Sequence, residues 1–148
     1  GRGQPGRGER RMAQRLVKEF KLPIYVLTDA DPWGMYIYSV IKQGSISLSY
    51  SEEKLATPSA QFIGLTTMDV EKFKIPKEVT IKLNQLDVKR LKEMEGYEWF
   101  QKKEWKQEFN NMREKAYKLE LEALSKKGIR FITETYVPKK IKEEDFLP

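Results

Sequence analysis

Two aspartates one residue apart, Asp29 and Asp31, have the type and spacing to do chemistry. They follow an apolar, β-prone run at 24–27 and precede Pro32 and Gly34. Because side chains at i and i+2 of an extended backbone point the same way, both carboxylates can face one hard cation. In open α/β sheets, ligand chemistry gathers beyond the carboxyl ends of strands, where this pair lies. The alternative is an Asp-Pro turn that closes a strand, since Asp, Pro and Gly are ordinary turn residues.

Composition restricts the metal that such a pair can hold. The sequence contains no cysteine and no histidine, which excludes thiolate ligands and cysteine nucleophiles and removes most zinc chemistry. Oxygen ligands favour Mg²⁺, Mn²⁺ or Ca²⁺. Two carboxylates alone bind Mg²⁺ weakly, because the ion keeps several waters and takes other ligands from substrate phosphates. The pair therefore suits Mg²⁺ beside a phosphodiester.

Positive charge is concentrated directly before the acid pair. The first 21 residues carry seven basic and two acidic side chains, which is +5 of the net +6 of the chain. A basic cluster beside a metal site suits a polyanion such as DNA. The alternative is a basic arm that only keeps the chain solvated. The candidate phosphate contacts lie in a glycine-rich loop and the start of the following helix: Arg2, Arg7, Arg10 and Arg11.

The elements that position these residues follow an α/β order. Hydrophobic periodicity and turn residues predict helices over 9–20, 34–43, 67–73, 85–94 and 103–127, strands over 24–27, 46–50 and 61–65, and an extended segment over 129–138 before a polar tail. This order predicts a mostly parallel sheet flanked by helices. The helix over 103–127 is predicted from the helical spacing of one apolar stripe: Trp105, Phe109, Met112, Ala116, Leu119 and Ala123.

The chain is long enough for one domain with its own core, which we expect to span 1–148. No apolar run approaches the roughly 20 residues of a membrane span, and the N-terminus lacks the apolar centre of a signal peptide. We therefore expect a cytoplasmic protein without a membrane contact. The chain opens in a loop and places a helix before any strand, so we expect a C-terminal fragment.

The acid pair stands in a longer segment, LPIYVLTDADPWGMYIY (22–38), which resembles the Toprim domain of topoisomerase VI A subunits and of the related meiotic double-strand-break transesterases. The loop 1–8 leading to Arg11 and the segments 55–58, 62–65 and 136–141 are also similar, so the resemblance covers essentially the whole chain. It implies a partial Toprim domain with its first strand missing and a long C-terminal helix. The loop departs from the family pattern, which carries an acid and a threonine where 6–9 stands here.

The resemblance also implies an activity and partners. The A subunit of this family dimerises, joins an ATP-binding B subunit in an A2B2 assembly, and cleaves double-stranded DNA so that another duplex can pass. Asp29 and Asp31 match the family D-x-D, which binds Mg²⁺. The family's metal-binding glutamate and nucleophilic tyrosine precede Gly1, so no tyrosine of this chain receives the catalytic role, and Glu9 is a weak candidate for the third ligand. Two alternatives remain: a DNA-binding and dimerisation module without chemistry, and another Toprim enzyme such as a primase or nuclease.

Overall fold

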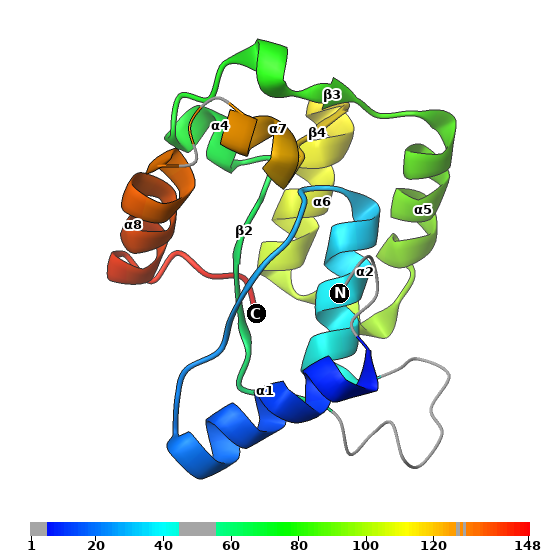
Figure 1. Ribbon diagram of the computed structural model, residues 1–148. Helices are drawn as coiled ribbons and strands as arrows, with labels where there is room; N and C mark the ends of the chain where they lie inside the picture. The colour runs from blue at the N-terminus through cyan, green and yellow to red at the C-terminus, as the bar shows by residue number, and fades with distance from the viewer. Residues whose placement is uncertain (1–5, 45–55, 127, 129) are drawn as a thin grey trace.

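A computed structural model describes residues 6–44, 56–126, 128 and 130–148 (Figure 1). Its helices are α1 (Arg7–Phe20), α2 (Pro32–Gln43), α4 (Asp69–Lys72), α5 (Gln85–Glu95), α6 (Lys103–Lys115), α7 (Leu121–Lys126) and α8 (Val137–Lys142), with 3₁₀ turns η1 (Lys77–Val79) and η2 (Glu98–Gln101) and a π-helical segment η3 (Phe131–Tyr136). Its strands are β1 (Tyr25–Leu27), β2 (Gln61–Gly64), β3 (Ile81–Lys82) and β4 (Tyr117–Lys118). Within the described residues, no helix is long and apolar enough to cross a membrane.

The parallel sheet expected from the sequence is present as the pair β1–β2. Val26 lies opposite Phe62, and a register shift follows before Leu27 pairs with Gly64. Figure 1 shows α2, α5 and α6 on one side of this pair and α8 on the other. The α/β class with a parallel pair flanked by helices is therefore confirmed, as are the helices predicted over 9–20, 34–43 and 85–94 and the strands over 24–27 and 61–65. The predicted strand over 46–50 lies outside the described residues.

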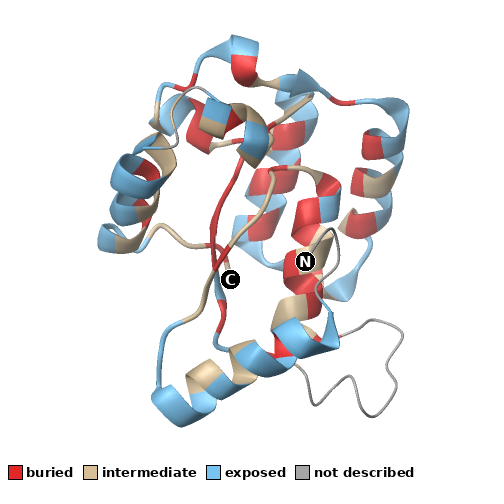
Figure 2. Ribbon diagram, in the orientation of Figure 1, coloured by how far each residue is buried: buried red, intermediate tan, exposed pale blue. Residues whose placement is uncertain are grey.

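The core lies between the strand pair and the helices (Figure 2). Its centre is aromatic: the Trp105 ring of α6 packs 5.2 Å from that of Phe62 and 5.8 Å from that of Tyr38, between ring centroids. Tyr38 comes from α2, the helix that follows the acid pair, and its hydroxyl donates to the carbonyl of Ala60 at 3.0 Å. The aromatic cluster therefore fixes α2 against β2 and so anchors one side of the acid motif.

The single helix predicted over 103–127 is wrong. The helix α6 ends at Lys115, because Ala116 adopts the left-handed conformation with φ of 56°. The chain then runs extended through β4, which pairs antiparallel with β3, and turns into α7. Leu119 is buried as the apolar stripe predicts, but in a strand-like bridge to Ala30. Of the predicted apolar stripe, Ala116 is exposed and Ala123 is half-buried, and the other four residues are buried.

The extended segment predicted over 129–138 is also wrong. Its described residues form η3 and the start of α8, and α8 continues to Lys142 in the segment expected to be a polar tail. The reason is a buried ionic contact: Lys140 on α8 donates to Asp69 at 3.0 Å, and the Tyr136 hydroxyl also donates to Asp69. After α8, Leu147 forms an antiparallel bridge with Phe62 and so extends the sheet beyond β2.

Candidate metal and DNA site

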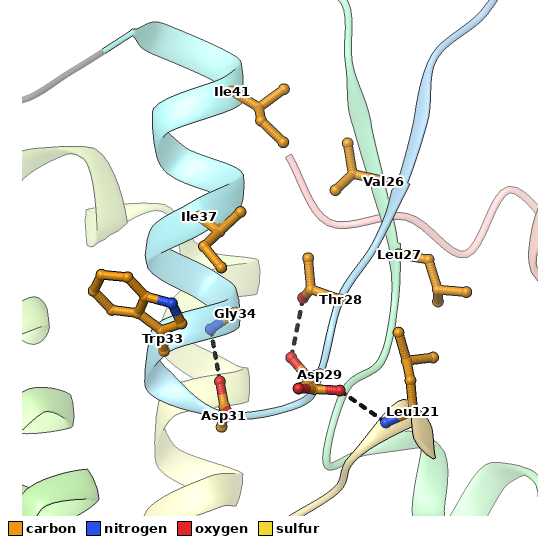
Figure 3. A pocket seen from close by; sticks show the side chains of 10 residues that line it. All are labelled: Val26, Leu27, Thr28, Asp29, Asp31, Trp33, Gly34, Ile37, Ile41 and Leu121. Carbon is orange, nitrogen blue, oxygen red and sulfur yellow. Dashed lines mark hydrogen bonds between the residues drawn. The ribbon is translucent and has the colours of Figure 1, made fainter. Parts of the chain in front are cut away.

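Asp29 and Asp31 line one open cavity of about 330 Å³ at the carboxyl end of β1 (Figure 3). The walls come from β1 and the residues that follow it, from α2 and from the start of α7. The complete lining is Val26, Leu27, Thr28, Asp29, Asp31, Trp33, Gly34, Ile37, Ile41 and Leu121. The two acids therefore share a cavity in the place where α/β folds bind ligands.

Asp31 is the N-cap of α2. Its backbone is extended, and its Oδ1 accepts a hydrogen bond from the N–H of Gly34 at 2.6 Å. Pro32 then occupies the first position of the helix, where its fixed φ is suitable and its missing N–H costs nothing. This cap starts α2, so the D-P-x-G segment is the beginning of a helix and not a turn. The cap leaves Oδ2 of Asp31 without a hydrogen bond to any described residue.

Asp29 is held by a distant part of the chain. Its Oδ1 accepts a hydrogen bond from the backbone N–H of Leu121 at 2.8 Å, at the first residue of α7. Between the two acids, Ala30 donates to Leu119 at 2.8 Å and accepts from it at 3.1 Å. The segment 117–121 therefore holds the acid motif in place through backbone hydrogen bonds. Periodicity in the sequence missed this contact, because it assigned 117–121 to a continuous helix.

The two carboxylates are oriented by opposite walls of the cavity. Figure 3 shows that of Asp31 directed toward α2 and that of Asp29 toward the start of α7. Each has one oxygen engaged by a backbone N–H, and Oδ2 of each remains for another ligand. Within the described part of the chain, no group of three acidic side chains is placed to hold a metal ion. A metal held by this pair would need further ligands from water, substrate or residues outside the described set.

Burial raises the pKa of Asp31 above its ordinary value. The hydrogen bond from Gly34 opposes this shift, the nearby charge of Asp29 reinforces it, and the charges of Lys118 and Asp87 act in opposite directions. A carboxylate that is partly withdrawn from water and next to another acid is stabilised by a bound cation.

Gly34 allows the helix to approach the acid motif. A Cβ at this position would overlap the backbone carbonyl oxygen of Asp29 and lie 2.8 Å from Oγ1 of Thr28. Carbon atoms do not approach oxygen so closely without a shift of one of the two. The glycine in the D-x-D-P-x-G segment is therefore required by packing. The sequence pattern placed it at a turn and at the start of the helix over 34–43, and did not predict this contact.

The basic residues predicted to contact phosphate divide into three groups. Arg7 and Arg11 are exposed on α1, Arg10 is buried at 6% exposure, and Arg2 lies outside the described residues. Glu9 accepts a hydrogen bond from the backbone N–H of Gly6 at 2.9 Å and is not among the residues that line the cavity of the acid pair. None of the tyrosines in the described ranges lines that cavity either.

Comparison with known proteins agrees with the family resemblance of the sequence. Residues 1–141 match the family model for the Toprim domain of Spo11 and the topoisomerase 6 A subunit. The chain is 47% identical to the A subunit of type 2 DNA topoisomerase 6 from Hyperthermus butylicus, over 98% of this chain and 40% of that protein. It is 46% identical to the protein of the same name from Saccharolobus shibatae, with the same coverage, and 44% identical to that of Pyrococcus abyssi, over 99% of this chain and 41% of that protein.

The chain thus spans about 40% of the length of the curated relatives that it matches. The matched region includes the strand, the acid pair and the helix that follows it. This chain belongs to the family of Toprim domains found in Spo11 and in the A subunit of topoisomerase 6.

Proposed function

We propose that this chain is the Mg²⁺-binding part of the DNA-cleaving A subunit of a type II, topoisomerase 6-like DNA topoisomerase. The observation that carries the proposal is the pair Asp29 and Asp31, which lines one cavity at the carboxyl end of β1. Family membership supports it, because the matched relatives are named as this subunit. On this proposal, residues 1–148 form one partial Toprim unit of a larger protein.

The residues of the cavity fit a hard cation. Both potential ligands are carboxylate oxygens, and the chain has no histidine or cysteine to favour a softer metal. Oδ2 of each acid has no hydrogen-bond donor among the described residues, while Oδ1 of each is oriented by a backbone N–H. When bound, Mg²⁺ supplies charge stabilisation for the leaving oxygen and orients the phosphate that is cut.

The chain's own residues contribute orientation and binding. Asp31 is fixed by the first turn of α2 and Asp29 by the start of α7, so both carboxylates are positioned before substrate arrives. Arg7 and Arg11, exposed on α1, bind DNA phosphates on this proposal. The nucleophilic tyrosine and a further acid come from the remainder of the full-length subunit. Its partners are double-stranded DNA, an ATP-binding B subunit and a second A subunit, in the cytoplasm.

The test is DNA cleavage by the full-length protein assembled with its B partner. Asp29→Asn and Asp31→Asn keep the size of the side chain and the oxygen that accepts the backbone hydrogen bond, but remove the charge. We expect each to abolish Mg²⁺-dependent cleavage of supercoiled DNA while leaving the unfolding temperature close to that of the unmodified subunit. Glu93→Gln, which removes an exposed acid from α5, is the matched control and should cleave normally.

The same assay separates the alternatives. Unchanged cleavage by both aspartate variants would contradict the metal assignment and favour a module that only binds DNA. Strand transfer through a covalent tyrosine link distinguishes a topoisomerase from a primase or a hydrolytic nuclease, because only the first leaves protein attached to the cut DNA end.

A further inference from the structure

The acid motif is bridged to Leu119, the residue that follows β4, in a register that brings a lysine toward Asp31. Ala30 and Leu119 exchange both of their backbone hydrogen bonds in an antiparallel bridge. In an antiparallel ladder, the residues next to such a pair face each other without hydrogen bonds, and their side chains come closest together. Continuing the register by one residue places Lys118 opposite Asp31.

Lys118 is bonded to a different carboxylate. Its Nζ donates to Oδ2 of Asp87 at 2.8 Å, and the two side chains are 14% and 9% exposed. Asp87 is fixed in turn at the N-terminus of α5, where it and Asn84 exchange capping hydrogen bonds of 3.0 and 2.8 Å. Among the described residues, no ion pair joins Lys118 to Asp31. The lysine therefore lies near two carboxylates and forms its ion pair with Asp87, the one outside the cavity.

We propose that the Lys118–Asp87 ion pair sets the affinity of the Asp29–Asp31 site for Mg²⁺, and that Asp87 keeps the Lys118 ammonium from pairing with Asp31. This inference rests on the proposed function. Lys118 is a positioning residue on this proposal, because it does not line the cavity of the acid pair and acts through the charge of Asp31. Without Asp87, the ammonium would compete with the metal for the same carboxylate oxygen.

The signs of the expected effects follow from charge. Asp87→Asn releases Lys118 toward Asp31 and makes the region less negative, so the affinity for a divalent cation falls. Lys118→Met removes the competing cation and leaves Asp87 charged, so the affinity rises. In the double variant both changes cancel, because no ammonium is left to be released. Lys118→Arg keeps the charge and should behave like the unmodified protein.

The experiment measures metal binding by the full-length subunit, without DNA and without turnover. Mn²⁺ is titrated and followed by electron paramagnetic resonance, and Mg²⁺ affinity is obtained by competition. We expect Asp87→Asn to weaken Mg²⁺ binding on the order of tenfold, Lys118→Met to strengthen it by a similar factor, and the double variant to lie within about threefold of the unmodified subunit. Asparagine at 87 retains the oxygen that caps α5, so thermal unfolding of the metal-free variants should change little.

The control is Lys72→Met, which breaks an ion pair with Asp145 of 2.9 Å on another part of the surface and should leave metal affinity unchanged. Equal affinities for all Lys118 and Asp87 variants would overturn the inference, as would weaker binding in every one of them, which is the pattern of a general structural defect.

Asp29→Asn and Asp31→Asn are titrated alongside. If these two variants bind metal normally, the proposed function fails. If they lose the metal while the Lys118 and Asp87 variants keep the metal affinity of the unmodified subunit, only the inference about the Lys118–Asp87 ion pair fails.

Discussion

Gly34 of α2 packs directly against the backbone carbonyl of Asp29, so that no side chain fits between the helix and the acid motif. The same glycine donates its N–H to Oδ1 of Asp31 at 2.6 Å. One residue without a side chain therefore controls the position of both acids. Through it, the first turn of α2 sets the distance between the helix and the end of β1.

Replacing Gly34 by alanine should displace the acid motif. The added Cβ must move either α2 or the Asp29 backbone, and such overpacking costs about 1–3 kcal/mol of unfolding free energy. We expect lower stability in chemical denaturation and a loss of Mg²⁺-dependent cleavage by the full-length subunit. Gly8→Ala is the matched control, because a Cβ there would meet no atom within 4 Å. Normal cleavage by Gly34→Ala would show that the close contact is not needed for function.

Asp31 should have separable structural and ligand roles. Asp31→Ala removes the helix cap as well as the charge and should cost about 1 kcal/mol of stability, whereas Asp31→Asn retains a capping oxygen and should cost less. Both variants should lose metal binding equally, since both lack the carboxylate. The measurements are urea denaturation and the Mn²⁺ titration. Stability losses of the same size in the two variants would contradict the capping role.

Glu108 on α6 should make stability depend on pH. It is 1% exposed, its carboxylate accepts hydrogen bonds from the backbone N–H of Thr67 at 3.0 and 2.9 Å, and burial raises its pKa from the usual 4.5 to about 8 against the effect of these bonds. The folded state then holds the proton more tightly than the unfolded state. The contribution of the protonated Glu108 to the free energy of unfolding is therefore complete below pH 4.5 and is lost as the pH rises through about 8.

Chemical denaturation at several pH values tests this. We expect Glu108→Gln to show a flatter pH dependence, with a difference from the unmodified subunit of at most about 1.4 kcal/mol per pH unit between those limits. Taking the difference between two proteins removes the contribution of all other titrating groups. Glu114→Gln, at an exposed position on the same helix, should follow the unmodified subunit. Parallel curves for Glu108→Gln and the unmodified subunit would contradict the raised pKa.

Arg7 and Arg11 should contribute to DNA binding without base specificity. Each phosphate contact adds about 0.9 to the slope of log affinity against log salt concentration, so Arg7→Gln/Arg11→Gln should lower the slope by about 2. Fluorescence anisotropy with duplex DNA over a range of salt concentrations measures it. Arg130→Gln removes an exposed charge before η3 and serves as the control. An unaltered slope in the double variant would show that α1 does not contact DNA. Arg10 is left unchanged, because it is buried.

The local elements around the acid pair could be predicted from the amino-acid sequence. The β-prone run at 24–27 stops before Asp29, and the Asp31-Pro32 step begins a helix, because capping and the fixed φ of proline act between near neighbours. The absence of histidine and cysteine means, on composition alone, that a metal bound by this chain would have to be a hard cation.

The contacts that hold that pair depend on the tertiary structure. Leu119 satisfies the helical spacing of its stripe, yet it is buried in a bridge to Ala30, while Leu121 donates to Asp29 and Lys118 pairs with Asp87. Hydrophobic periodicity reports which side chains leave water and contains no information on which distant backbone will pair with them. The helix ends at Lys115, with Ala116 in the left-handed conformation, and the backbone groups that follow bond to β3 and to the acid motif.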